Sequence, residues 1–194
     1  MFDNLKKYHI ILASNSPRRR ELLAGLGIDF EVRVLKDIDE HYPEGSLAPD
    51  DVALFIATKK AEANRTVMGE DELVITADTV VILGDEVLGK PADADDAKRM
   101  LRMLSGRVHH VVTGVCLTTK TQQRSFKVST DVTFKALTDE EINYYVATYQ
   151  PLDKAGAYGI QEWIGYIGVT GLDGSYFNVM GLPVQRIYNE LLHF

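Results

Sequence analysis

A stretch of twelve residues, Glu72 to Leu83, limits the folds open to this chain more than any other segment. It reads ELVITADTVVIL, and its β-branched and apolar residues predict a strand buried in a sheet. A single carboxylate, Asp78, interrupts the run. A carboxylate in such surroundings must be paired, must bind a metal or must face a cleft at a strand end. We therefore expect the strand to bend or break near Asp78, although a simple salt bridge would also account for this residue taken alone.

The other segments alternate between helical and strand patterns. The order predicts an α/β fold with a mixed sheet, long antiparallel ribbons and flanking helices, built as a single domain over residues 1–194. Expected strands lie at residues 8–13, 30–35, 72–83, 108–119 and 124–137, and expected helices at 17–26, 51–66, 93–104, 138–149 and 182–194. Thr138 and Glu141 have the spacing of a capping box.

Charge and cysteine content exclude several classes of protein. The chain has 21 Lys and Arg against 28 Asp and Glu, a net charge of −7, which argues against nucleic acid as a partner. Cys116 is the single cysteine, so neither an intrachain disulfide nor a cysteine-based zinc site is expected. The apolar run near the N-terminus is too short for a signal peptide or a membrane span. We expect no membrane association and a cytoplasmic location.

The segment ASNSPRRR, residues 13–20, breaks a local rule of helix construction. Ser16 can cap a helix and Pro17 suits its first position, yet arginines 18–20 follow at the end where the helix dipole is already positive. A bound phosphate would relieve the repulsion, because helix N-termini and arginine side chains both bind phosphate oxygens. Arginines that are merely solvated or paired are the alternative, and Arg20 suits it best.

Two lysines and an acidic segment extend this candidate site. Lys59 and Lys60 both lie beside the apolar stripe of the helix expected at residues 51–66, and periodicity does not decide which of them faces a cleft and which reaches water. The DIDE segment, residues 37–40, is acidic surface in the simplest interpretation. If one of its carboxylates folds toward Asp78, the two offer the hard oxygen ligands that Mg²⁺ or Mn²⁺ prefers.

Six motifs in this chain resemble, in their order, those of the Maf family of nucleotide pyrophosphatases. They are LASNSPRR, ADTVV, LGKP, LSGR, DKAGAYGIQ and VMGLP, and the resemblance runs from Ile11 to Phe194. It implies hydrolysis of a nucleoside triphosphate to the monophosphate and pyrophosphate, with a divalent metal. It also implies a fold like that of the inosine triphosphate pyrophosphatases, with two lobes around a cleft, in a cytoplasmic homodimer. The family is linked with division arrest and septum formation.

The resemblance also assigns roles to individual residues. Asp78 matches the proton acceptor, and Glu40 matches the acid after the second strand, although Asp39 leaves that register open by one residue. These two carboxylates would hold the metal. The residues implied in catalysis are Asp78, Glu40, Lys60 and Lys90, and those implied in substrate binding and specificity are Ser16, Arg18, Arg19, Thr79 and Gln161.

The choice of branch rests on three of these positions. In the branch that acts on UTP and dTTP, an arginine stands in the first motif, a threonine follows the catalytic aspartate and GIQ ends the late loop, as Arg18, Thr79 and Gln161 do here. The sister branch, which prefers methylated guanosine triphosphate, typically has an aromatic residue at the first position. The amide of Gln161 suits a uracil edge or, alternatively, closes a loop hydrogen bond. The family often has glycine after this glutamine, where this chain has Glu162.

The resemblance thus implies a hydrolase of dTTP and UTP, or of modified pyrimidine nucleotides in a house-cleaning role. The alternative is a non-catalytic nucleotide-binding regulator of cell division. The carboxylate of Asp78 favours the enzyme, because a protein that only binds anions gains little from a negative charge there.

Overall fold

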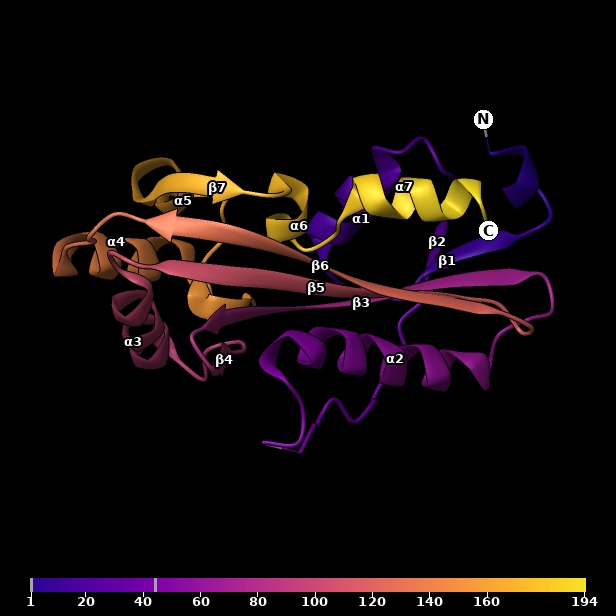
Figure 1. The fold of residues 1–194 in the computed structure, drawn as a ribbon, viewed down its shortest axis with the longest axis horizontal. Helices are drawn as coiled ribbons and strands as arrows, with labels where there is room; N and C mark the ends of the chain where they lie inside the picture. Colours follow the sequence, from indigo (N-terminus) through magenta and orange to yellow (C-terminus); the bar gives the residue numbers. More distant parts are fainter. Residues whose placement is uncertain (1, 44) are drawn as a thin grey trace. The chain divides into compact units, whose positions relative to one another are not determined.

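The computed structural model describes residues 2–43 and 45–194. Its α-helices are α1 (Pro17–Ala24), α2 (Val52–Arg65), α3 (Ala94–Leu104), α4 (Asp139–Tyr149), α5 (Trp163–Gly168), α6 (Tyr176–Met180) and α7 (Val184–Leu192). Its strands are β1 (His9–Leu12), β2 (Glu31–Val32), β3 (Glu72–Leu83), β4 (Glu86–Leu88), β5 (Val108–Thr118), β6 (Gln123–Phe134) and β7 (Val169–Asp173). Short 3₁₀ turns, η1 (Asp3–Leu5), η2 (Pro49–Asp51) and η3 (Ala155–Ala157), complete the element order (Figure 1).

Within the described residues the strands form one mixed sheet in the order β2-β1-β3-β5-β6-β7, and β4 pairs with β3 outside this path. Strand β1 is parallel to both β2 and β3, whereas β3–β4 and β6–β7 are antiparallel. The short turn between the long strands β5 and β6 is closed by the Thr119 N–H, which donates to the Gln122 carbonyl over 2.9 Å. The expected mixed sheet with long ribbons and flanking helices is confirmed.

The chain divides into two compact units. The first unit comprises Met1–Asp78, Thr113–Val128 and Gly181–Phe194, and the second comprises Thr79–Val112 and Ser129–Met180. The boundary in β3 falls between Asp78 and Thr79, so the candidate proton acceptor is the last residue of its segment in the first unit.

In the first unit, helices cover both faces of the parallel strands. Figure 1 shows α2 on one face of β1 and β3, and α1 with α7 on the other. Thr76 of β3 donates its hydroxyl to the carbonyl of Ala57 in α2 over 2.8 Å, so a buried polar group joins strand to helix. Gly114 of β5 lies so close to α2 that a Cβ there would stand 2.4 Å from the backbone of Leu54. A side chain at this position would force the helix away from the sheet.

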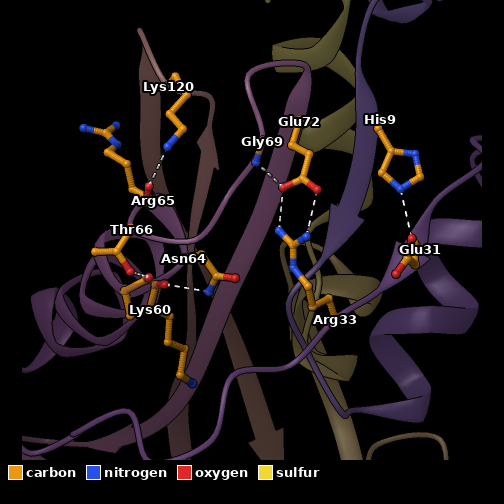
Figure 2. Close-up of polar contacts among 11 residues, drawn as sticks. His9, Glu31, Arg33, Lys60, Asn64, Arg65, Thr66, Gly69, Glu72 and Lys120 are labelled. Carbon is orange, nitrogen blue, oxygen red and sulfur yellow. Dashed lines mark hydrogen bonds and ion pairs between the residues drawn. The ribbon is translucent and has the colours of Figure 1, made fainter.

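The second strand is much shorter than the range of residues 30–35 that the sequence predicts, because only Glu31–Val32 pairs with β1. Beyond it the Arg33 N–H still donates to the Leu12 carbonyl of β1, and the Arg33 side chain reaches β3 (Figure 2). Arg33 donates to both carboxylate oxygens of Glu72 over 2.7 and 2.6 Å, and Glu72 also accepts the Gly69 N–H. The hydrogen bonds from Arg33 lower the pKa of Glu72 to about 2. The start of the acidic loop is therefore fastened to the start of β3.

The second unit has its own apolar core, to which α3, α4 and the adjoining parts of the sheet contribute. Helix α4 begins with the predicted capping box, since Thr138 Oγ1 accepts the Glu141 N–H and the Glu141 carboxylate accepts the Thr138 N–H. Tyr145 of this helix is fully buried. Its apolar ring lies in the core, and its hydroxyl reaches residues 153–162, the late loop that leads into α5.

The sequence predicted a bend or a break in β3 near Asp78, and the break does not occur. Strand β3 is continuous from Glu72 to Leu83, with Asp78 partly exposed and paired. The glycine-rich region, residues 156–181, for which the sequence predicted no element, contains α5, β7 and α6. In the part of the chain that the structure describes, none of the helices is long and apolar enough to cross a bilayer.

We predict that Gly114→Ala destabilises the protein by at least about 1–3 kcal/mol, because its methyl group would overlap the backbone of α2. Urea unfolding followed by circular dichroism measures the effect. Gly89→Ala is the matched control, since nothing lies within 4 Å of a Cβ there. Equal unfolding free energies for the two variants would contradict the close approach.

A second prediction concerns pH. His109 is fully buried, its Nε2 lies 2.6 Å from the hydroxyl of Tyr158, and burial lowers its pKa to about 4. In the unfolded chain His109 takes up a proton near pH 6.5, whereas in the folded chain it does so only near pH 4. The free energy of unfolding therefore decreases as the pH falls from 6.5 toward 4. The slope from this group between pH 6.5 and 5.5 should average about 1 kcal/mol per unit, because the unfolded histidine is only half protonated at pH 6.5. In His109→Asn that slope should flatten, and an unchanged slope would assign it to other groups.

Candidate active site

Three charged side chains from different elements of the first unit meet around one ammonium group. Lys60 of α2 places its Nζ 2.9 Å from Asp78 Oδ1 on β3 and 3.2 Å from Glu40 Oε1 on the acidic loop. The side chains of Lys60 and Asp78 are only 13% and 16% exposed, whereas that of Glu40 is 51% exposed. A cation shared by two carboxylates, largely shielded from water on one side, is the centre of this candidate site.

The neighbouring lysine has a different task. Lys59 donates to Asp39 Oδ2 over 3.1 Å and to the His41 carbonyl over 2.9 Å, and the other oxygen of Asp39 accepts the His41 N–H. These bonds, the one from His41 first, lower the pKa of Asp39. Lys59 thus fixes the residues on either side of Glu40. Periodicity left open the choice between Lys59 and Lys60, and the resemblance left open the choice between Asp39 and Glu40. In the structure Lys60 and Glu40 lie beside Asp78, whereas Lys59 and Asp39 anchor the loop.

A hollow of about 530 Å³ lies on the Lys59 side of this loop. It is lined by Leu35, Lys36, Asp37, Ile38, Asp39, Lys59, Glu62, Ala63 and Thr66. Among the described residues its lining does not include Glu40, Lys60 or Asp78. The charged centre is therefore separate from this hollow.

Helix α1 begins as the sequence predicts, with Ser16 as N-cap and Pro17 in the first turn. The Ser16 hydroxyl accepts the Arg19 N–H at 3.4 Å. The Arg19 side chain then turns inward and donates to the Gly181 carbonyl over 2.7 Å and to the Ala77 carbonyl over 2.9 Å. Arg19 therefore ties the start of α1 both to the segment before α7 and to the residue that precedes Asp78.

The electrostatics of Arg19 reflect this position. Burial lowers the pKa of its guanidinium, Asp78 and Glu40 oppose the shift, and Arg18 adds to it. The group nevertheless stays cationic, since arginine does not lose its proton in proteins. Arg18 is partly buried, whereas Arg20 is exposed, which confirms the expectation that Arg20 belongs to the surface.

The donor set suits a divalent cation only when a ligand completes it. Among residues 2–43 and 45–194, no cluster of three or more His, Cys, Asp or Glu side chains is placed to hold a metal. Mg²⁺, however, is usually bound by one or two carboxylates together with water and substrate phosphates. Asp78 and Glu40 already share a cation in Lys60, so their chemistry fits that pattern.

The remaining predicted residues belong to the second unit. Thr79 follows Asp78 in β3 and is partly buried, and Lys90 is exposed between β4 and α3. Gln161 is partly buried in the loop before α5. Its Oε1 is shielded from water and has no hydrogen-bond partner among the residues that the structure describes. The loop hydrogen bond that would have given this oxygen a purely structural role is therefore not seen.

Sequence reasoning missed two residues next to the predicted ones. Ser14 is buried, and its hydroxyl accepts the Ser16 N–H at 3.3 Å and a bond from Arg19 at 3.4 Å. Lys154 is 8% exposed and pairs with Glu162, the residue that replaces the family's usual glycine. Both stand inside the quoted motifs, so an inventory of every polar residue in a motif would have found them. Trp163 packs on the core of the second unit.

We predict that Lys60→Met lowers the unfolding free energy at neutral pH by about 2–3 kcal/mol, because Asp78 and Glu40 then face each other without their shared cation. Lys59→Met, the same substitution one residue earlier, should cost no more than about 1 kcal/mol, since Asp39 is well exposed. Thermal and urea unfolding of both variants provide the comparison. A larger loss in the Lys59 variant would reverse these assignments.

Comparison with known proteins agrees with this geometry. The sequence model of the family described as Maf-like protein matches residues 9–194. A dTTP/UTP pyrophosphatase of Phocaeicola vulgatus is 62% identical over 191 residues, which cover 98% of each chain. Proteins of the same name from Parabacteroides distasonis and Flavobacterium johnsoniae are 60% and 48% identical, covering 100% of both chains in the first case and 97% and 96% in the second. The chain therefore belongs to the family of Maf-like proteins.

Proposed function

We propose that this protein hydrolyses dTTP and UTP to the nucleoside monophosphate and pyrophosphate. The observation that carries the proposal is the Lys60 ammonium bound by Asp78 and Glu40, next to the inward-turned Arg19. The names of the close relatives, dTTP/UTP pyrophosphatase, agree with it. The names of the relatives give dTTP and UTP as their substrates. For this chain we also propose hydrolysis of modified pyrimidine nucleotides in a house-cleaning role.

In the proposed reaction a water molecule attacks the α-phosphorus. A bond forms between the water oxygen and the α-phosphorus, the bond from that phosphorus to the bridging oxygen breaks, and pyrophosphate leaves with the electron pair. Asp78 is proposed to accept the proton of the attacking water, as a carboxylate within hydrogen-bond reach of the nucleophile can do. Lys60 holds this carboxylate in place, because its ammonium lies 2.9 Å from Oδ1.

Neutralisation of the triphosphate is the second requirement, since about four negative charges must be approached by the nucleophile. Arg18 and Lys90 are proposed to bind phosphate oxygens, with Ser16 and the N-terminus of α1 beside them. Arg19 is proposed to contribute positive charge from a fixed position, because two of its bonds are already made to carbonyl groups.

A divalent cation, Mg²⁺ or Mn²⁺, is proposed as cofactor, with Asp78 and Glu40 as its protein ligands. When bound, such an ion neutralises phosphate charge and polarises the phosphoryl group. The two carboxylates converge on one point in the structure, and that convergence supports the proposal.

Recognition of the base is assigned to Gln161. Uracil and thymine share an N3–H donor beside a carbonyl acceptor, and a primary amide offers the complementary acceptor and donor. The buried, unpartnered Oε1 of Gln161 suits that N3–H, whereas cytosine has an acceptor at the same position. Arg18 and Thr79 are proposed to support this choice of substrate.

The setting of the enzyme is also a proposal. We infer a cytoplasmic homodimer in which residues 1–194 form one catalytic domain, with a role connected to cell division. These inferences rest on the family alone, and the substrate is the nucleotide and not a nucleic acid, in keeping with the net charge of −7.

We predict pyrophosphate release from UTP and dTTP in the presence of Mg²⁺ or Mn²⁺, with CTP and GTP turned over at least about tenfold less efficiently. Asp78→Asn should lower kcat by about 10²–10⁴-fold while the affinity for UTP changes little, because the amide cannot accept the proton. Coupled pyrophosphate detection and calorimetric binding measure the two quantities.

Asp85→Asn, at an exposed aspartate in the turn between β3 and β4, is the control for loss of one negative charge. Full activity in Asp78→Asn would end the assignment of the proton acceptor. Binding of UTP without release of pyrophosphate by the unmodified protein would instead favour the non-catalytic regulator.

A further inference from the structure

The late loop of the second unit, residues 153–162, is closed by a polar network that the proposed chemistry does not use. Lys154, near its start, is 8% exposed, and its Nζ lies 2.8 Å from Asp153 Oδ1 and 3.2 Å from Glu162 Oε1. The ion pair with Glu162 joins the two ends of the loop. Because both side chains are largely buried, the pair is poorly screened by solvent.

Helix α4 provides the second attachment of this loop. The hydroxyl of Tyr145 donates to Glu162 Oε2 and accepts the Gly159 N–H over 3.0 Å. Burial and the hydrogen bond to Glu162 raise the pKa of Tyr145, so it remains a donor at any physiological pH. One buried hydroxyl therefore holds both the middle and the end of the loop against α4.

Three side chains of this loop occupy the space beside Gly159, where any other residue would place its Cβ. A Cβ on Gly159 would lie 3.0 Å from Glu162 Cδ, 3.1 Å from Lys154 Cε and 3.2 Å from Gln161 Nε2. The amide nitrogen of Gln161 is therefore packed against the same glycine as the ion pair. The opposite end of that amide, Oε1, is the buried acceptor without a partner among the described residues.

The backbone of the loop is also held in an unusual conformation. Gly156 and Ala157 have φ of 67° and 60°, in the left-handed region, and Ala157 is not a glycine. Gly156 also approaches Val81, since a Cβ there would be 2.7 Å from Cγ2. Such a conformation persists only where the surroundings impose it, and such sites often serve function.

We propose that Tyr145, Lys154 and Glu162 are positioning residues that fix the amide of Gln161 for recognition of the uracil or thymine edge. The inference rests on the proposed function and deepens it, because it names what makes Gln161 selective. Glu162 supplies the acceptor for both Lys154 and Tyr145. A preorganised amide distinguishes N3–H from N3, whereas a mobile one can turn to satisfy either base.

The test compares kcat/KM for UTP and CTP. Tyr145→Phe keeps the buried ring but removes the hydroxyl, and Glu162→Gln removes the charge opposite Lys154. Each should reduce the preference for UTP over CTP about tenfold, mainly through KM, with thermal unfolding recorded alongside. Tyr149→Phe is the matched control, because Tyr149 lies on the same helix, stacks on Tyr145 and is 37% exposed. It should leave the preference unchanged.

A double-mutant cycle with Gln161→Ala separates positioning from stability. If Tyr145 acts through Gln161, the preference already lost in Gln161→Ala should not fall further when Tyr145→Phe is added. Additive losses, or an unchanged preference in both single variants, would overturn the inference while the proposed function stands. If the unmodified protein turned over UTP and CTP equally, the role of Gln161 itself would fall, and this inference with it.

Discussion

The contact of Lys60 with Asp78 and Glu40 is the interaction on which the candidate site depends. Two carboxylates at one point repel each other, and the ammonium group between them offsets that repulsion. It also brings three elements together, since α2, β3 and the acidic loop each supply one partner. The proposed site for a divalent cation and a polyphosphate is built around this contact.

Around this centre, three further cations set the positions of the charged groups. Arg33 fastens the start of the acidic loop to β3, and Lys59 holds the residues on both sides of Glu40. Arg19 of α1 holds the backbone next to Asp78 through its hydrogen bond to the Ala77 carbonyl. Each of these cations donates hydrogen bonds to protein carbonyl or carboxylate groups. The positions of Glu40 and Asp78 are therefore fixed without a bound ligand.

The second unit contains Gln161, the residue proposed to recognise the base, in its late loop. A neutral amide is not oriented by long-range charge. We propose that contacts orient it, through the buried ion pair of Lys154 with Glu162, the hydroxyl of Tyr145 and the space left by Gly159.

Much of this could be predicted from local patterns. The strand at residues 72–83 matched to the residue, and the capping box at Thr138 and Glu141 formed as its spacing indicates. The predicted break at Asp78 did not occur, because the carboxylate found a partner on α2 that no local pattern reveals. The strand predicted at 30–35 kept only two paired residues, and the side chain of Arg33, which follows them, binds Glu72 of β3. The short elements of the glycine-rich region have too few residues for periodicity to register.

The sequence by itself determined the order of the longer helices and strands, the cap and arginines of α1, and the residue types of the proposed phosphate and metal site. These are local or compositional properties, and they do not depend on how distant segments pack. Only the tertiary structure decided that Lys60 and Glu40, and not Lys59 and Asp39, meet Asp78, and that Glu162 neutralises a buried Lys154. Choices between adjacent residues depend on contacts across the fold, where a shift of one position turns a side chain from the site to the surface.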